Sequence, residues 1–79
     1  MSYDIYSAID KISERLDKIG LLQWSQQLQD DVVAGATSSE IFGALRWHLR
    51  QLLEAQPILP GDLKFWIDEA IEEINRTGI

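Results

Sequence analysis

The chain of 79 residues contains no cysteine, only two prolines and a single histidine. Without cysteine, no disulfide, thiolate or cysteine-based zinc site can hold the fold together or carry chemistry. The absence of cysteine also fits a reducing compartment, so we expect a cytoplasmic protein.

Long apolar runs are absent as well. The longest uninterrupted apolar stretches are a few residues, far short of the roughly 20 that a membrane-spanning helix needs. Charged side chains are scattered through the first twenty residues, so no apolar signal-peptide core fits there. The sequence therefore predicts no membrane segment.

Positive charge is scarce, with seven Lys and Arg against 13 Asp and Glu and a net charge of −6. Nucleic-acid backbones and anionic lipid surfaces both require Lys and Arg on the contact face. We therefore expect no nucleic acid and no membrane as a partner. A basic protein surface is the natural complement of this charge.

Apolar residues instead recur at steps of three and four, the spacing that gives a helix one apolar face. The pattern predicts a first helix over residues 3–19, ended or bent at Gly20, and a second helix that begins at Leu21 and is stopped by Gly35. The apolar stripes are Ile5, Ala8, Ile9, Ile12, Leu16 and Ile19 in the first helix, and Leu21, Trp24, Leu28 and Val32 in the second. The opposite face of the second helix holds Gln23, Gln27, Asp30 and Asp31.

A third helix is predicted from the capping box Thr37-Ser38-Ser39-Glu40. Here the Thr37 hydroxyl accepts from the amide of Glu40, and the Glu40 carboxylate reaches back to the amide of Thr37. Its main stripe is Ile41, Leu45, Leu49 and Leu52, broadened by Phe42 and Leu53. Gly43 and Trp47 lie on a different side, which predicts a helix sandwiched between neighbours, one of them close to Gly43.

The remaining chain predicts a fourth helix after a turn bracketed by Pro57 and Pro60, with Gly78 as its stop. Its stripe is Leu63, Trp66, Ile67, Ala70, Ile71 and Ile74. We predict one all-α domain over residues 1–79, a compact four-helix domain that is either up-and-down or orthogonal. We expect the third helix to be central, with Leu45 and Leu49 among the most buried residues.

Catalytic and metal chemistry find little support in the pattern. His48 lies at the edge of the third helix's stripe, and the positions one turn away are Ala44 and Leu52, which cannot bind a metal. A half-buried structural histidine is therefore predicted. The paired carboxylates lack a histidine or convergent polar groups, so we expect no enzyme, no cofactor and no metal.

One aromatic side chain falls on the polar side of the fourth helix. Phe65 points about 180° away from the apolar stripe and shares its face with Asp68, Glu69 and Glu72. An aromatic anchor surrounded by carboxylates is typical of a contact surface for a basic protein. The alternative is that Phe65 packs under the N-terminal segment, on Tyr3 or Tyr6.

Two arginines, Arg46 and Arg50, lie one turn apart on the third helix. They either grip a phosphate or carboxylate as an anion-binding pair or form ion pairs with Glu40, Glu54 or an acidic residue of another helix.

The segment Gly35-Ala36-Thr37-Ser38-Ser39-Glu40-Ile41, followed by Leu45-Arg46-Trp47-His48-Leu49, resembles a motif of small uncharacterised bacterial helical proteins. That resemblance covers about twenty residues and implies a bacterial source. In size, acidity and helical class the chain is also similar to colicin-type immunity proteins, which neutralise a basic nuclease through carboxylates and aromatics. Their Tyr-Tyr-Pro signature is missing here.

Three functions remain open at this stage. The first is a protein-binding module, an immunity- or antitoxin-like inhibitor of a basic bacterial protein. The second is an oligomerising structural subunit with Trp47 or Phe65 at the self-interface. The third is an acyl-carrier-like domain modified at Ser38, because Gly35-Ala36-Thr37-Ser38 has the carrier spacing, although Thr37 replaces the carrier's Asp.

Overall fold

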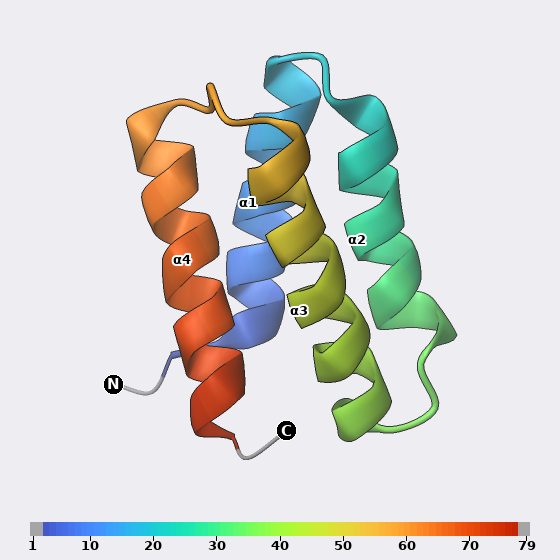
Figure 1. Cartoon of the computed structure of the whole chain (residues 1–79). Coiled ribbons are helices and arrows are strands. Elements are labelled where there is room, and N and C mark those ends of the chain that lie inside the picture. The colour runs from blue at the N-terminus through green and yellow to red at the C-terminus, as the bar shows by residue number, and fades with distance from the viewer. Residues whose placement is uncertain (1–2, 78–79) are drawn as a thin grey trace.

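Four α-helices make up most of residues 3–77, the part of the chain that the structure, a computed structural model, describes. They are α1 (Ile5–Lys18), α2 (Leu22–Ala34), α3 (Ser38–Ala55) and α4 (Gly61–Arg76) (Figure 1). Each helix runs opposite to the one before it, joined by short connections. The topology is therefore up-and-down, one of the two arrangements that the sequence allowed.

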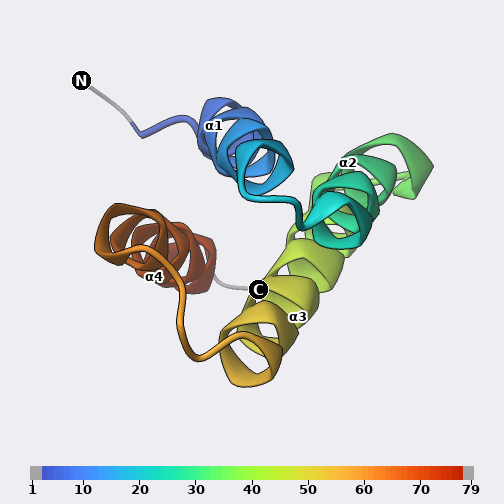
Figure 2. The ribbon, with the colours of Figure 1, turned by 90° about the horizontal axis from the view of Figure 1, so that it is seen from above.

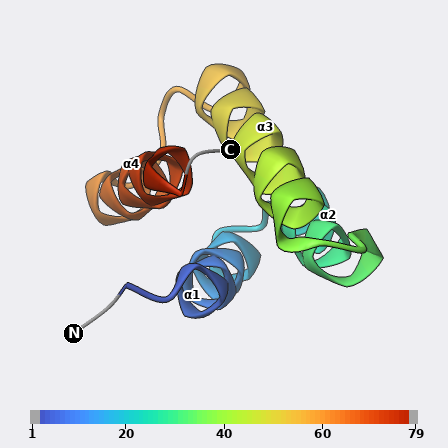
Figure 3. The same ribbon diagram turned by 90° about the horizontal axis from the view of Figure 1, so that it is seen from below.

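The helices occupy four corners when seen along their axes (Figures 2 and 3). α1 packs against α2 and α4, and α3 packs against the same two helices. The core between them contains Ile5, Ile9, Ile12, Leu16, Leu28, Leu45, Leu49, Leu52, Leu63, Ile67, Ala70 and Ile74. All of these come from the predicted stripes, and the prediction that Leu45 and Leu49 are deeply buried is confirmed.

The helix ends follow local chemistry. The Asp4 carboxylate accepts from the amide of Tyr6 at 3.0 Å and begins α1. Gly20 has φ of +84°, a left-handed conformation that only glycine adopts without strain, which confirms it as the stop. Ile19, predicted to lie on the apolar stripe, is instead the C-cap residue of α1 and is 38% exposed, because the helix has already ended.

The capping box of α3 is confirmed in one half. The Thr37 hydroxyl accepts from the amide of Glu40 at 3.2 Å. The Glu40 carboxylate reaches one residue further back than predicted, and accepts from the amide of Ala36 at 3.1 Å rather than from Thr37. Gly35 precedes this box because a Cβ there would collide with the side chain of Ile41.

The prediction that α3 is sandwiched on two sides is wrong. α2 and α4 pack on either flank of its single leucine stripe, so the side that carries Gly43 and Trp47 faces solvent. Trp47 is 62% exposed, and a Cβ built on Gly43 would meet nothing within 4 Å.

α4 ends at Arg76, and the predicted stop at Gly78 lies outside the described residues. Among the helices of residues 3–77, none combines the length and apolar character needed to cross a bilayer.

The buried leucines provide a test of the core. Leu49→Ala should lower the free energy of unfolding by about 2–5 kcal/mol, because it leaves a cavity at a fully buried site. Urea titration followed by circular dichroism measures this loss. Leu22→Ala is the matched control, since Leu22 is 61% exposed and its removal should change stability little. Equal losses in both variants would contradict the observed core.

The cap provides a second test. Thr37→Ala should lower the free energy of unfolding by about 0.5–2 kcal/mol, because the amide of Glu40 loses its acceptor. Ser39→Ala changes an exposed side chain and should be nearly silent in the same urea titration. The reverse order of effects would place the start of α3 after Ser39.

Candidate functional site

The outer face of α4 carries the side chains that the sequence singled out. Leu63, Ile67, Ala70 and Ile74 all point into the core, so Phe65 is turned to solvent and is 60% exposed. Asp68, Glu69 and Glu72 are also exposed and lie on the same helical face, three, four and seven residues further along. We call these four residues the α4 outer patch.

The alternative packing of Phe65 on Tyr6 is absent from the structure. Tyr6 packs instead on Phe42 of α3, with ring centroids 5.6 Å apart. This contact joins two diagonal helices and leaves Phe65 uncovered by α1.

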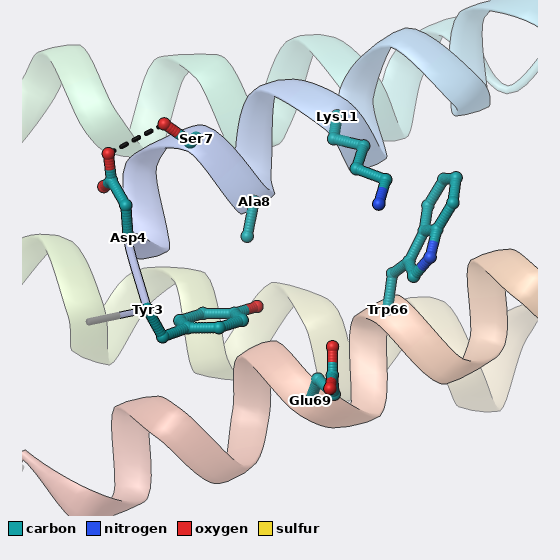
Figure 4. A pocket seen from close by; sticks show the side chains of 7 residues that line it. All are labelled: Tyr3, Asp4, Ser7, Ala8, Lys11, Trp66 and Glu69. Atoms are coloured by element: carbon teal, nitrogen blue, oxygen red, sulfur yellow. Dashed lines mark hydrogen bonds between the residues drawn. The ribbon is translucent and has the colours of Figure 1, made fainter. Parts of the chain in front are cut away.

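A hollow of about 230 Å³ between α1 and α4 borders the α4 outer patch. Its lining residues are Tyr3, Asp4, Ser7, Ala8, Lys11, Trp66 and Glu69. In Figure 4 the Glu69 carboxylate stands between the rings of Tyr3 and Trp66. Glu69 thus belongs both to the patch and to the hollow, and the two form one continuous acidic and aromatic surface.

The hollow holds charges of both signs, because Asp4 and Glu69 are acidic and Lys11 is basic. The Lys11 ammonium lies 4.0 Å from the centroid of the Trp66 ring, a cation–π contact. Partial burial, together with the charges of Glu69 and Glu73, raises the pKa of Tyr3 above its usual range. At the rim, the Ser7 hydroxyl donates to Asp4 at 2.7 Å and is the main cause that lowers the pKa of that carboxyl.

Arg46 and Arg50 have different surroundings although they are one turn apart. The Arg46 guanidinium donates from Nη1 to Oδ1 of Asn75 at 2.9 Å, which ties α3 to the end of α4. Arg50 is exposed, and within residues 3–77 its side chain has no hydrogen bond or ion pair, so the predicted pairing with Glu40 or Glu54 is not found.

The prediction that Asp31 lies on the polar face of α2 is wrong. Asp31 is 7% exposed and contacts His48 of α3, with 2.6 Å between Oδ2 and Nδ1. Because a carboxylate can only accept, Nδ1 carries the proton. Gln27 also donates to Asp31, at 3.2 Å. His48 is half-buried, as predicted, and Asp31 was detectable from its position only about 60° from Leu28 on the helix.

Residues 3–77 contain no group of three or more His, Asp and Glu side chains arranged to hold a metal ion. Ser38 is exposed as the first residue of α3. No family model, curated protein or solved structure matches the chain. The function must therefore be inferred from the geometry of the surface.

The Asp31–His48 pair generates a prediction for α2 and α3. His48→Ala should lower the free energy of unfolding by about 1–3 kcal/mol, because a buried carboxylate oxygen loses its donor. Asp30→Ala, at the exposed neighbour, should stay within about 0.5 kcal/mol of the parent in the same urea titration. The double variant Asp31→Ala/His48→Ala should lose less free energy of unfolding than the sum of the losses of Asp31→Ala and His48→Ala measured separately. Strict additivity would contradict a direct coupling.

Proposed function

We propose that the protein binds a basic partner protein through the α4 outer patch and acts as an immunity- or antitoxin-like inhibitor of that partner. One observation supports this most strongly. Phe65 is 60% exposed on a helix whose apolar stripe is already complete in the core, and three carboxylates surround it. Folding does not use this aromatic ring, and an interface would bury it.

The two kinds of side chain have different roles in such an interface. The carboxylates attract a positively charged surface over a distance and mainly raise the association rate. Phe65 loses its water only in the docked complex and therefore mainly slows dissociation.

Phe65→Ala is the central test of this proposal. The variant should bind the partner that co-purifies from the native host about 30-fold more weakly, a loss of roughly 2 kcal/mol. Its melting temperature should stay close to that of the parent. Surface plasmon resonance measures the affinity, and the parent's affinity should fall as salt rises, because exposed charges are screened.

Trp47→Ala is the matched control, because Trp47 is 62% exposed on a different helix and its loss should leave partner capture unchanged. Co-expression tests the inhibitory role, since the parent should relieve the growth defect caused by the partner and Phe65→Ala should not. The proposal is wrong if Phe65→Ala lowers the melting temperature sharply while capture remains intact. Salt-independent affinity would equally exclude the carboxylates from the interface.

A further inference from the structure

The outward side of α3 carries a second set of residues that no other helix covers, of which Gly43 is half-buried and the other three are exposed. Glu40, Gly43, Trp47 and Arg50 follow one another at steps of three, four and three, so they lie within about 80° of one another on the helix. We call these four residues the α3 outer stripe. α2 and α4 pack on the flanks of α3 (Figure 2), and neither covers this stripe.

Within residues 3–77, no contact explains why position 43 is glycine. Glycine in a helix interior costs about 1 kcal/mol relative to alanine. A Cβ at this position would meet no atom within 4 Å, so alanine would fit the isolated chain. Because Gly43 has no side chain, it leaves a gap in the row of side chains along the stripe, and we call this gap the hole; it lies one helical turn from Trp47, which is 62% exposed.

The two charged residues of the stripe, Glu40 at one end and Arg50 at the other, have opposite signs. Arg50 is exposed and lacks a side-chain partner within residues 3–77. Glu40 uses Oε2 to accept from Ala36, which holds its carboxylate in place and leaves Oε1 free for a second donor.

We propose that the α3 outer stripe is a self-association surface, and that a second copy of this chain covers it with its own α3 in an antiparallel, two-fold arrangement. In a two-fold dimer the two α3 helices run in opposite directions. If the axis passes at the level of residue 45, a residue a given number of positions after 45 contacts the residue the same number of positions before 45 in the second copy. Trp47 then enters the hole over Gly43 of the second copy, and Arg50 meets Glu40 of the second copy. Both pairs occur twice, once on each side of the axis.

Self-complementarity identifies the occupant as a second copy. The stripe contains both members of each contacting pair, Trp47 with Gly43 and Arg50 with Glu40. Both pairs form together only when the second helix runs antiparallel to the first. One helix pair covers an area at or below the low end of specific interfaces, about 1,200 Å², so we expect a weak dimer whose population depends on concentration.

Charge exchange tests the register with the full chain. Sedimentation equilibrium from about 10 µM to about 1 mM should show dimers for the parent. Arg50→Glu places acid opposite acid at both pairs and Glu40→Arg places base opposite base, so each variant alone should dimerise at least about tenfold more weakly. An equimolar mixture of the two variants restores both pairs and should dimerise again. Circular dichroism verifies that each variant is folded.

Gly43→Ala should change two quantities in opposite directions, the stability of the monomer and the affinity of the dimer. At high dilution the variant should melt at a higher temperature than the parent, because alanine favours the helix. Its dimer should nevertheless be at least about tenfold weaker, since the methyl group fills the hole that receives Trp47. Phe65→Ala, on α4, should leave self-association unchanged, and Arg50→Glu should leave capture of the basic partner unchanged, so the two proposals fail independently.

Three results would overturn the proposed dimer. They are a parent that remains monomeric throughout the concentration range, single charge variants that dimerise like the parent, and a mixture of variants that stays monomeric. Loss of the dimer on Phe65→Ala would place the self-interface on α4 and would likewise exclude the α3 outer stripe.

Discussion

Burial of one apolar stripe per helix is the constraint on which the rest of the structure depends. A chain of 79 residues without cysteine removes only roughly 60–65% of its surface from water on folding, so little apolar area can be spared. Each stripe therefore faces the common centre, and every helix packs against two neighbours. The outward faces are left free of any role in the core.

Polar contacts then connect each pair of neighbouring helices at the edge of this core. Each contact contributes little free energy where solvent reaches it. It can form, however, only when the two helices have one particular alignment along their axes. The links are Gln29–Ser13 at 3.0 Å between α2 and α1, Asp31–His48 at 2.6 Å between α2 and α3, Arg46–Asn75 at 2.9 Å between α3 and α4, and Arg15–Asp62 at 3.5 Å between α1 and α4. The apolar stripes determine which faces meet, and these links help to set the register.

Periodicity was sufficient to predict the four helices and nearly all of the core, because the step of three and four is a local property of the chain. It also placed Phe65 opposite the apolar stripe of the fourth helix, but it could not decide whether the N-terminal segment covers the ring. It could not predict the pairing of Asp31 with His48, which are 17 residues apart, because polar partners across helices depend on packing angles. The surroundings of Trp47 were mispredicted for the same reason, since the two neighbours of α3, α2 and α4, both pack against its leucine stripe and leave the side that carries Trp47 uncovered.

Two exposed aromatic side chains on different helices allow the two proposed interfaces to coexist. A dimer built around the α3 outer stripe occupies the face that carries Trp47. It leaves the α4 outer patch of both copies open, because Phe65 lies on a different helix, on the side of α4 that faces away from the core. The dimer would then present two acidic patches related by a two-fold axis. A partner with one basic site would bind each copy separately, so that self-association and partner binding stay independent.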